Sequence, residues 1–228
     1  MRNTSTVPVG LRVSALTLTL ALLCGQAHGR GPLTNADVPV TTWFVAHRSA
    51  AFDRAALFVT DLGSPAVTVL LAGLCGVALA WHRRSVLPGV LVVGTVAAAT
   101  TASTALKLVV ERSRPALDLQ EILESDYSFP SGHVTGTAAL LGITAAILLG
   151  RRRRTVRVCG AVLVACGVAI VAVTRLYLGV HWLTDVIAGA VLAAVFVTVG
   201  IAVHEHGSSR IGARTPSKPL PAVERVGG

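Results

Sequence analysis

Residues 174–203 are TRLYLGVHWLTDVIAGAVLAAVFVTVGIAV, and this stretch decides the fold. From Leu183 to Val203 its one charged residue is Asp185, in an otherwise largely apolar run. An α-helix needs about 20 mostly apolar residues to cross the hydrocarbon core of a bilayer. The charged side chains gather before this run and at its start, so the stretch predicts a membrane helix that begins in a polar cluster.

Five further apolar runs precede this one. They extend from about Val13 to Ala27, Ala66 to Trp81, Leu87 to Val110, Val134 to Gly150 and Val156 to Leu178. The chain has 228 residues, a length that suits one domain. Its mean hydropathy of +0.69 is too high for an ordinary soluble domain. We therefore predict an all-α fold, a polytopic membrane helical bundle with six transmembrane helices.

The first run is the shortest. It follows Arg2 and Arg12 and ends in small residues, a pattern that also fits a cleavable signal peptide. We favour a retained transmembrane helix within residues 1–28. Under either interpretation the following segment starts outside the cytoplasm, so the topology of the remaining chain is the same.

The segment from Ala36 to Leu62 mixes apolar residues at rough helical spacing with charged ones. This pattern predicts an interfacial helix that leads into the second span. The sequence Asp61-Leu62-Gly63-Ser64-Pro65 then predicts a break and a restart of the helix.

The net charge of +9 raises the possibility of a nucleic-acid partner. The basic residues lie beside apolar spans, however, where the positive-inside rule accounts for them. Aromatic residues make up only 4% of the chain, too few for a base-stacking surface. We therefore expect the membrane, and no nucleic acid, as a partner.

The basic loops also set the orientation. With Arg83-Arg84 and the 151–157 loop inside, 13 of the 20 Lys and Arg residues are cytoplasmic. Residues 204–228 are then also inside, and their Ser, Pro, Gly and Arg content predicts a disordered cytoplasmic tail.

Three polar clusters emerge on the outer face in this topology. They are Lys107 with Arg114-Pro115, Pro130-Ser131-Gly132-His133, and Thr174-Arg175 with His181 and Asp185. Ionisable groups at membrane edges are costly to place and usually mark a functional site. Three cations, two histidines and a carboxylate suit the binding of a phosphate and an attack on it.

Each cluster fits one part of phosphoryl transfer. Arginine offers a planar fork to two phosphate oxygens, and lysine a point charge. A helix start at Ser131 and Gly132 would present free N–H groups to an anion, with His133 placed to donate a proton. His181 and Asp185 share one helix face, so the carboxylate can fix the tautomer and leave the other ring nitrogen free to attack.

Alternatives remain for the separate clusters. Lys107 and Arg114 could extend to lipid headgroups, Ser131 could be only a helix cap, and the third cluster only a stabilising His–Asp pair. A two-histidine, one-carboxylate metal site from His133, His181 and Asp185 is also conceivable. Three nearby cations would oppose a metal ion and favour an anion, so we expect no metal and no cofactor.

Residues beside the clusters have weaker signals. Glu111 and Arg112 are predicted to be a surface pair. Asp126 and Tyr127, directly before the second cluster, are weaker candidates for contact with a substrate.

In this order, Lys-x6-Arg-Pro, Pro-Ser-Gly-His and Thr-Arg-x5-His-x3-Asp resemble the type 2 phosphatidic acid phosphatase (PAP2) family, a relative of bacterial acid phosphatases and vanadium haloperoxidases. The resemblance covers Lys107 to Asp185 closely and the six-span layout loosely. The third motif begins with Thr174, where the family usually has serine, so a hydroxyl is kept.

The resemblance implies a PAP2-like phosphatase core over residues 29–203 that needs no metal. His181 would be the nucleophile and form a phosphohistidine, Asp185 would orient it, and His133 would protonate the leaving oxygen. The residues implied to hold the phosphoryl oxygens are Lys107, Arg114, Ser131, Gly132 and Arg175.

We therefore expect an integral membrane phosphatase that hydrolyses a lipid phosphate monoester or pyrophosphate at the outer leaflet, in a plasma membrane of bacterial inner-membrane type. The resemblance implies phosphatidate, phosphatidylglycerol phosphate, diacylglycerol pyrophosphate or undecaprenyl pyrophosphate as substrate.

A phosphotransferase or a vanadate-dependent oxidant with the same site is one alternative, although the known haloperoxidases are soluble. A non-catalytic lipid-phosphate binder or a transporter is another, against which the lack of ionisable residues in mid-span argues. The oligomeric state stays open.

Overall fold

The computed structural model describes residues 7–29 and 31–213, with side chains described up to His206. Within these residues the regular structure is helical throughout. The α-helices are α1 (Val9–Gly29), α2 (Asp37–Ala46), α3 (Ala50–Leu62), α4 (Pro65–Arg83), α5 (Val86–Val110), α6 (Gly132–Leu149), α7 (Arg154–Tyr177) and α8 (Leu183–Ala213). Two short 3₁₀ helices, η1 (Pro32–Ala36) and η2 (Leu117–Leu119), lie in the connections.

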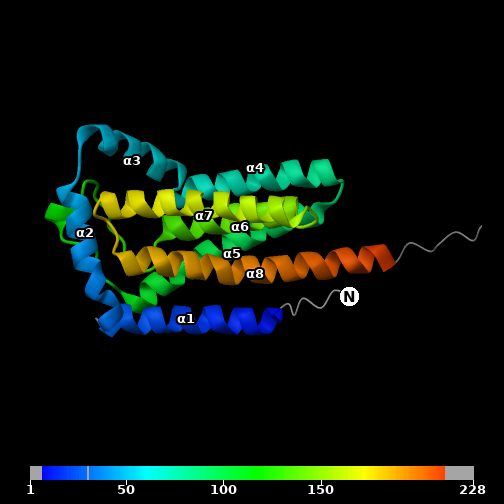
Figure 1. Ribbon diagram of the computed structural model, residues 1–228, viewed down its shortest axis with the longest axis horizontal. Helices are drawn as coiled ribbons and strands as arrows, with labels where there is room; N and C mark the ends of the chain where they lie inside the picture. Colours follow the sequence, from blue (N-terminus) through cyan, green and yellow to red (C-terminus); the bar gives the residue numbers. More distant parts are fainter. Residues whose placement is uncertain (1–6, 30, 214–228) are drawn as a thin grey trace, which may run out of the picture.

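Six helices are long and apolar enough to cross a membrane: α1, α4, α5, α6, α7 and the part of α8 from Leu183 to His206. They lie side by side, whereas α2 and α3 lie at one end of the bundle (Figure 1). The prediction of an all-α membrane bundle with six spans is confirmed. A helix is the form that lets a lone segment satisfy all its backbone hydrogen bonds inside lipid.

Helix α6 is the centre of the bundle and packs against α4, α5, α7 and α8. The core around it is built from small and branched apolar side chains, including Val96, Ala99, Ala139, Ile143 and Ala193. Small residues at such contacts let helix backbones approach closely, which matters in lipid because exclusion from water does not drive helices together. This packing brings the ends of α5, α6, α7 and α8 to one place.

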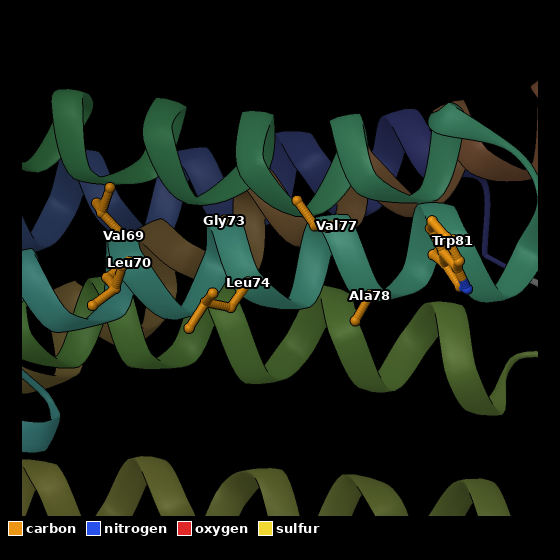
Figure 2. A pocket seen from close by; sticks show the side chains of 7 residues that line it. All are labelled: Val69, Leu70, Gly73, Leu74, Val77, Ala78 and Trp81. Atoms are coloured by element: carbon orange, nitrogen blue, oxygen red, sulfur yellow. The ribbon is translucent and has the colours of Figure 1, made fainter.

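Helix α4 presents an apolar face away from the core. Val69, Leu70, Leu74, Val77 and Trp81 project from this face along a shallow depression (Figure 2). These side chains are exposed, and on a membrane-spanning helix such a surface contacts lipid. Trp81 lies at the end of the helix near the basic loop, where aromatic residues commonly meet the membrane interface.

The segment 36–62 forms two helices, α2 and α3, instead of the single interfacial helix that the pattern predicted. The chain breaks at His47-Arg48-Ser49 because tertiary hydrogen bonds hold it there. Arg48 donates to the carbonyl oxygens of Tyr177 and Leu119 at 2.8 and 2.7 Å. The backbone N–H of Ser49 donates to the Tyr177 hydroxyl at 2.8 Å.

The predicted break and restart between Asp61 and Pro65 is confirmed. Helix α3 ends at Leu62 and α4 begins at Pro65. Ser64 caps α4, and its hydroxyl accepts a bond from the N–H of Val67 at 3.4 Å.

The ends of the described chain extend the bundle. Helix α1 lies along α8, with Leu23 and Ala27 buried against Phe129 and Ala188. Helix α8 continues to Ala213, so the first part of the segment 204–228 is helical rather than disordered, and residues 214–228 lie outside the described part. That residues 1–28 contain a retained transmembrane helix, and not a cleaved signal peptide, stays a prediction.

Gly89 allows α4 and α5 to meet. A Cβ atom at this position would lie 2.5 Å from the carbonyl oxygen of Gly76. We expect Gly89→Ala to lower the free energy of unfolding in detergent by about 1–3 kcal/mol, because the two backbones must move apart. The matched control is Gly94→Ala on the same helix, where a Cβ would meet nothing within 4 Å. Equal melting temperatures for the two variants would contradict this contact.

Candidate active site

The three sequence clusters meet at one end of the bundle, where α2 and α3 lie. Lys107 is in the last turn of α5, and Arg114 is in the connection that follows. Ser131 and Gly132 lie at the start of α6, and Arg175 lies in the last turn of α7. The third cluster continues into α8, whose first turn contains Asp185. Residues up to 78 positions apart in the sequence, from Lys107 to Asp185, therefore form one polar site.

His181 and Asp185 are fully buried side by side. The Nδ1 atom of His181 lies 3.4 Å from Oδ2 of Asp185, and this oxygen also accepts the N–H of Trp182 at 2.9 Å. The Nε2 atom of His181 faces the guanidinium of Arg114 at 3.4 Å. One ring nitrogen is thus oriented by a carboxylate, and the other points toward a cation.

The pKa of His181 lies well below its ordinary value. Burial is the main cause, because it disfavours the charged imidazolium, and the positive charges of Arg175, Arg114 and Lys107 add to it. A neutral imidazole that presents Nδ1–H to Asp185 keeps a lone pair on Nε2. The site therefore favours the form of His181 that can act as a nucleophile.

Arg112 joins Asp185 to a second buried carboxylate. One guanidinium nitrogen contacts Oδ1 of Asp185 and the hydroxyl of Thr184, both at 2.6 Å, and the other contacts Asp37 at 2.6 Å. Asp37 also accepts the N–H of Thr184 at 2.9 Å. The predicted surface pair of Glu111 and Arg112 is therefore wrong, because Arg112 turns inward to neutralise two carboxylates that the fold buries.

No sequence pattern indicated Asp37, and the reason is physical. It lies in the mixed segment between the first two spans, 75 residues before Arg112, and no local spacing connects the two. A carboxylate at the start of α2 is an ordinary helix-terminal residue by its pattern. Only the docking of α2 across the bundle end places it behind Asp185.

The cations of the site contact an acidic stretch of the connection between α5 and α6. Lys107 contacts the Asp126 carboxylate at 2.9 Å and donates to the carbonyl oxygen of Tyr127. Arg114 bonds to the Asp126 carboxylate, and it donates to the Asp126 and Val180 carbonyl oxygens at 2.7 and 2.6 Å. Asp126 therefore bridges two of the predicted phosphate ligands, a role that its weak sequence signal did not indicate.

Asp126 stays ionised in this position. Partial burial alone would raise its pKa, but hydrogen bonds from Lys107 and Arg114 and their positive charges outweigh burial and lower the pKa to about 2. Asp126 therefore remains a carboxylate across the physiological pH range and pairs with both cations.

Arg175 is the most deeply buried cation of the site. It donates to the hydroxyl of Thr60 at 2.8 Å and pairs with Glu124, which lies 3.7 Å from Arg114 as well. Sequence reasoning found Arg175 and missed Thr60 and Glu124. Both come from segments without a motif, and they reach Arg175 only through the docking of α3 and of the α5–α6 connection.

Several buried polar atoms at this end lack a hydrogen-bond partner within the described residues. They include Oγ of Ser131, Oγ of Ser103 and Nε of Arg175. A Cβ atom at Gly132 would have ordinary contacts only, 3.6 Å from Pro65 and 4.0 Å from Ser103. The start of α6 thus combines a hydroxyl without a partner, that of Ser131, with a glycine whose surroundings are not tightly packed, an arrangement that fits an anion.

His133 lies in the first turn of α6 and is partly buried. Arg175, Arg114, Lys107 and the imidazole of His181 all lie close enough to influence it, so it lies within the cluster. His133, His181 and Asp185 do not form a metal-ligand group among the described residues. The hydroxyl of Thr174, in place of the usual serine, donates to the carbonyl oxygen of Val171 at 2.8 Å in its own helix.

Comparison with known proteins identifies the class. Residues 88–207, more than half of the chain, match the PAP2 superfamily, and the chain belongs to this family. It is thus a phosphatase of the PAP2 class and an integral membrane protein, as its motifs predicted.

Two curated relatives are similar over most of their length. The chain is 26% identical to phosphatidylglycerophosphatase B of Bacillus subtilis over 182 residues, which are 77% of this chain and 86% of the relative. It is 34% identical to decaprenylphosphoryl-5-phosphoribose phosphatase of Mycobacterium tuberculosis over 180 residues, which are 75% of this chain and 92% of the relative.

Two solved structures share the fold. The transmembrane PAP2-type phosphatidylglycerolphosphate phosphatase of Bacillus subtilis superposes with a TM-score of 0.78 at 23% identity, over 86% of this chain and 96% of that one. LpxE of Aquifex aeolicus gives 0.57 at 19% identity, over 73% and 95% of the two chains. Both similarities extend to most of the bundle and show the arrangement of its helices.

Arg112 offers a test of the buried network. We expect Arg112→Lys to lower kcat about tenfold or more with little change in KM, because lysine cannot bridge both carboxylates and a charge-assisted bond contributes about 1.5–3 kcal/mol. The measurement is phosphate release from phosphatidate, together with thermal unfolding. Arg54→Lys, an exposed arginine on the same side, is the matched control. A rise in KM with unchanged kcat would assign Arg112 to substrate binding instead.

Proposed function

We propose that this protein hydrolyses the phosphate monoester or pyrophosphate of a membrane lipid through a phosphohistidine at His181. The observation that carries the proposal is the position of this ring, with Nδ1 beside the Asp185 carboxylate and Nε2 facing Arg114. Such a pair holds the attacking nitrogen toward the place where the cations would bind a phosphoryl group.

In the first step, the lone pair on Nε2 of His181 attacks phosphorus, a P–N bond forms, and the bond from phosphorus to the lipid oxygen breaks. His133, protonated when the negatively charged phosphate is bound, gives its proton to that oxygen. Asp185 accepts a hydrogen bond from Nδ1–H and stabilises the positive charge that develops on the ring. The lipid leaves as an alcohol, or as a lipid monophosphate when the substrate is a pyrophosphate.

In the second step, water attacks the phosphohistidine and the P–N bond breaks. Neutral His133 takes the proton of the water, and inorganic phosphate leaves. His181 returns to the neutral form that its surroundings favour, and both histidines end as they began.

The phosphoryl oxygens would be held by the remaining residues of the clusters. Lys107, Arg114 and Arg175 supply positive charge, while Ser131 and the N–H groups at Gly132 supply neutral donors. Glu124 and Asp126 contact the same cations, so a phosphate would compete with them for donors. Oγ of Ser131 and Nε of Arg175, which lack a partner among the described residues, would donate hydrogen bonds to the phosphate without giving up another contact.

The place of the site and the names of the relatives support a lipid substrate. The clusters lie where helices of membrane-spanning length end, within reach of a headgroup. The names of the two relatives, phosphatidylglycerophosphatase B and decaprenylphosphoryl-5-phosphoribose phosphatase, both refer to phosphates of lipids. We place this end of the bundle on the extracytoplasmic face of a bacterial inner membrane, because the dense arginine loops lie at the other end.

The nucleophile is tested with phosphatidate, phosphatidylglycerol phosphate and undecaprenyl pyrophosphate in detergent that contains EDTA. We expect release of phosphate from at least one of them, no release by His181→Ala, and unchanged release by His47→Ala, an exposed histidine on the same side. Labelled substrate should leave an acid-labile, alkali-stable phosphate on the wild-type chain alone. Full activity of His181→Ala would exclude the mechanism.

The role of His133 is tested through the leaving group. We expect His133→Asn to slow the hydrolysis of phosphatidate by about 10²–10⁴-fold, since the alkoxide that leaves needs a proton. With p-nitrophenyl phosphate the loss should be much smaller, because nitrophenolate leaves without one. An equal loss with both substrates would show that His133 acts in binding or in water activation only.

A further inference from the structure

The structure contains a second cavity at the membrane face opposite the candidate active site. It has a volume of about 850 Å³ and lies among α6, α7 and α8. Helices α7 and α8 both pack along α6 but hardly touch each other, so a crevice remains between them. Its lining comes from α6, α7 and α8, from the loop between α6 and α7, and from Arg83 at the end of α4.

The walls of this cavity between the helices are largely apolar. Gly142, Ala145 and Leu149 of α6 are spaced by three or four residues, as are Ala161 and Val164 of α7. The small residues Gly142, Ala145 and Ala161 leave room that larger side chains would fill. The volume falls in the range of roughly 300–1,000 Å³ that is common for small-molecule pockets.

The rim of the cavity is basic. Arg83, Arg151, Arg152 and Arg157 line it, and the structure records no ion pair or side-chain hydrogen bond for them in its described part. Glu205 is the single carboxylate among the lining residues, so positive charge is in excess. The buried Nδ1 atom of His204 also lacks a partner there.

We propose that this cavity binds an anionic phospholipid of the leaflet opposite the candidate active site. One acyl chain would lie in the crevice between α7 and α8, and the headgroup phosphate would contact the four arginines. Removal of a hydrocarbon chain from water and pairing of phosphate with arginine forks both favour this ligand. Basic pockets between membrane helices are known to bind acidic headgroups in this way.

Charge complementarity selects an anionic amphiphile over other occupants. A zwitterionic lipid would bring a cation to a rim that is already positive. A soluble anion would leave the apolar walls without a partner. Arginines that only extend to the general membrane surface would need no cavity beneath them.

The test compares two double variants of one loop in purified full-length protein. Arg151→Gln/Arg152→Gln removes two charges that line the cavity, and Arg153→Gln/Arg154→Gln removes two that do not. The probe is dioleoyl phosphatidylserine, titrated in detergent and followed by native mass spectrometry, with dioleoyl phosphatidylcholine as the zwitterionic reference. Phosphatidylserine is a phosphodiester with no phosphate monoester to hydrolyse, so its binding is measured without turnover.

We expect the first variant to weaken phosphatidylserine binding about tenfold or more and the second less than about threefold. Phosphatidylcholine should bind more weakly than phosphatidylserine to the wild type. Equal effects of the two variants would mean that loop charge attracts the lipid without a cavity, and would overturn the proposal.

A second pair of variants tests the crevice. Ala161→Phe fills it from an exposed position on α7, whereas Ala165→Phe places the same ring one turn away, outside the cavity. We expect Ala161→Phe alone to weaken phosphatidylserine binding, about fivefold or more, with thermal unfolding unchanged. Unchanged binding, or full displacement of the lipid by millimolar inorganic phosphate, would reduce the site to a headgroup contact and overturn the role of the acyl chain.

Discussion

The active end of this protein depends on the carboxylate of Asp185, which is fully buried and accepts bonds from His181, Trp182 and Arg112. Removal of one partner from a buried ion pair costs roughly 3–5 kcal/mol, because the other charge is left without compensation. Arg112 meets this requirement and continues to Asp37, so the network ties α2 and the α5–α6 connection to α8. The ring of His181 is oriented by the same network.

The membrane imposes the second constraint, since each span must satisfy its own backbone hydrogen bonds and therefore be a helix. Polar groups are then confined to helix ends and to connections. A bundle packed around α6 brings the ends of α5, α6, α7 and α8 together, so a catalytic constellation can form without a charged residue in mid-span. The apolar walls of the second cavity follow from the same packing at the other end.

Charge balance determines much of the structure of the candidate site. Three cations in a partly buried place repel one another, and Glu124 and Asp126 compensate them in this structure. A phosphate that binds there would replace part of this compensation. The same residues stabilise the folded site and, under the proposed function, would compete with a substrate phosphate for the cations.

The sequence alone determined the six spans, the family and the three clusters, because long apolar runs and short motifs are local patterns. It predicted the pair of His181 and Asp185 from a four-residue spacing on one helix face. In the structure His181 lies in the connection before α8, and its ring still meets Asp185 in the first turn of that helix. Only the tertiary structure decided the split of segment 36–62, the inward turn of Arg112, and the contacts of Asp37, Thr60 and Glu124. Those contacts join segments far apart in the chain, and their energy comes from burying opposite charges together, which no local pattern records.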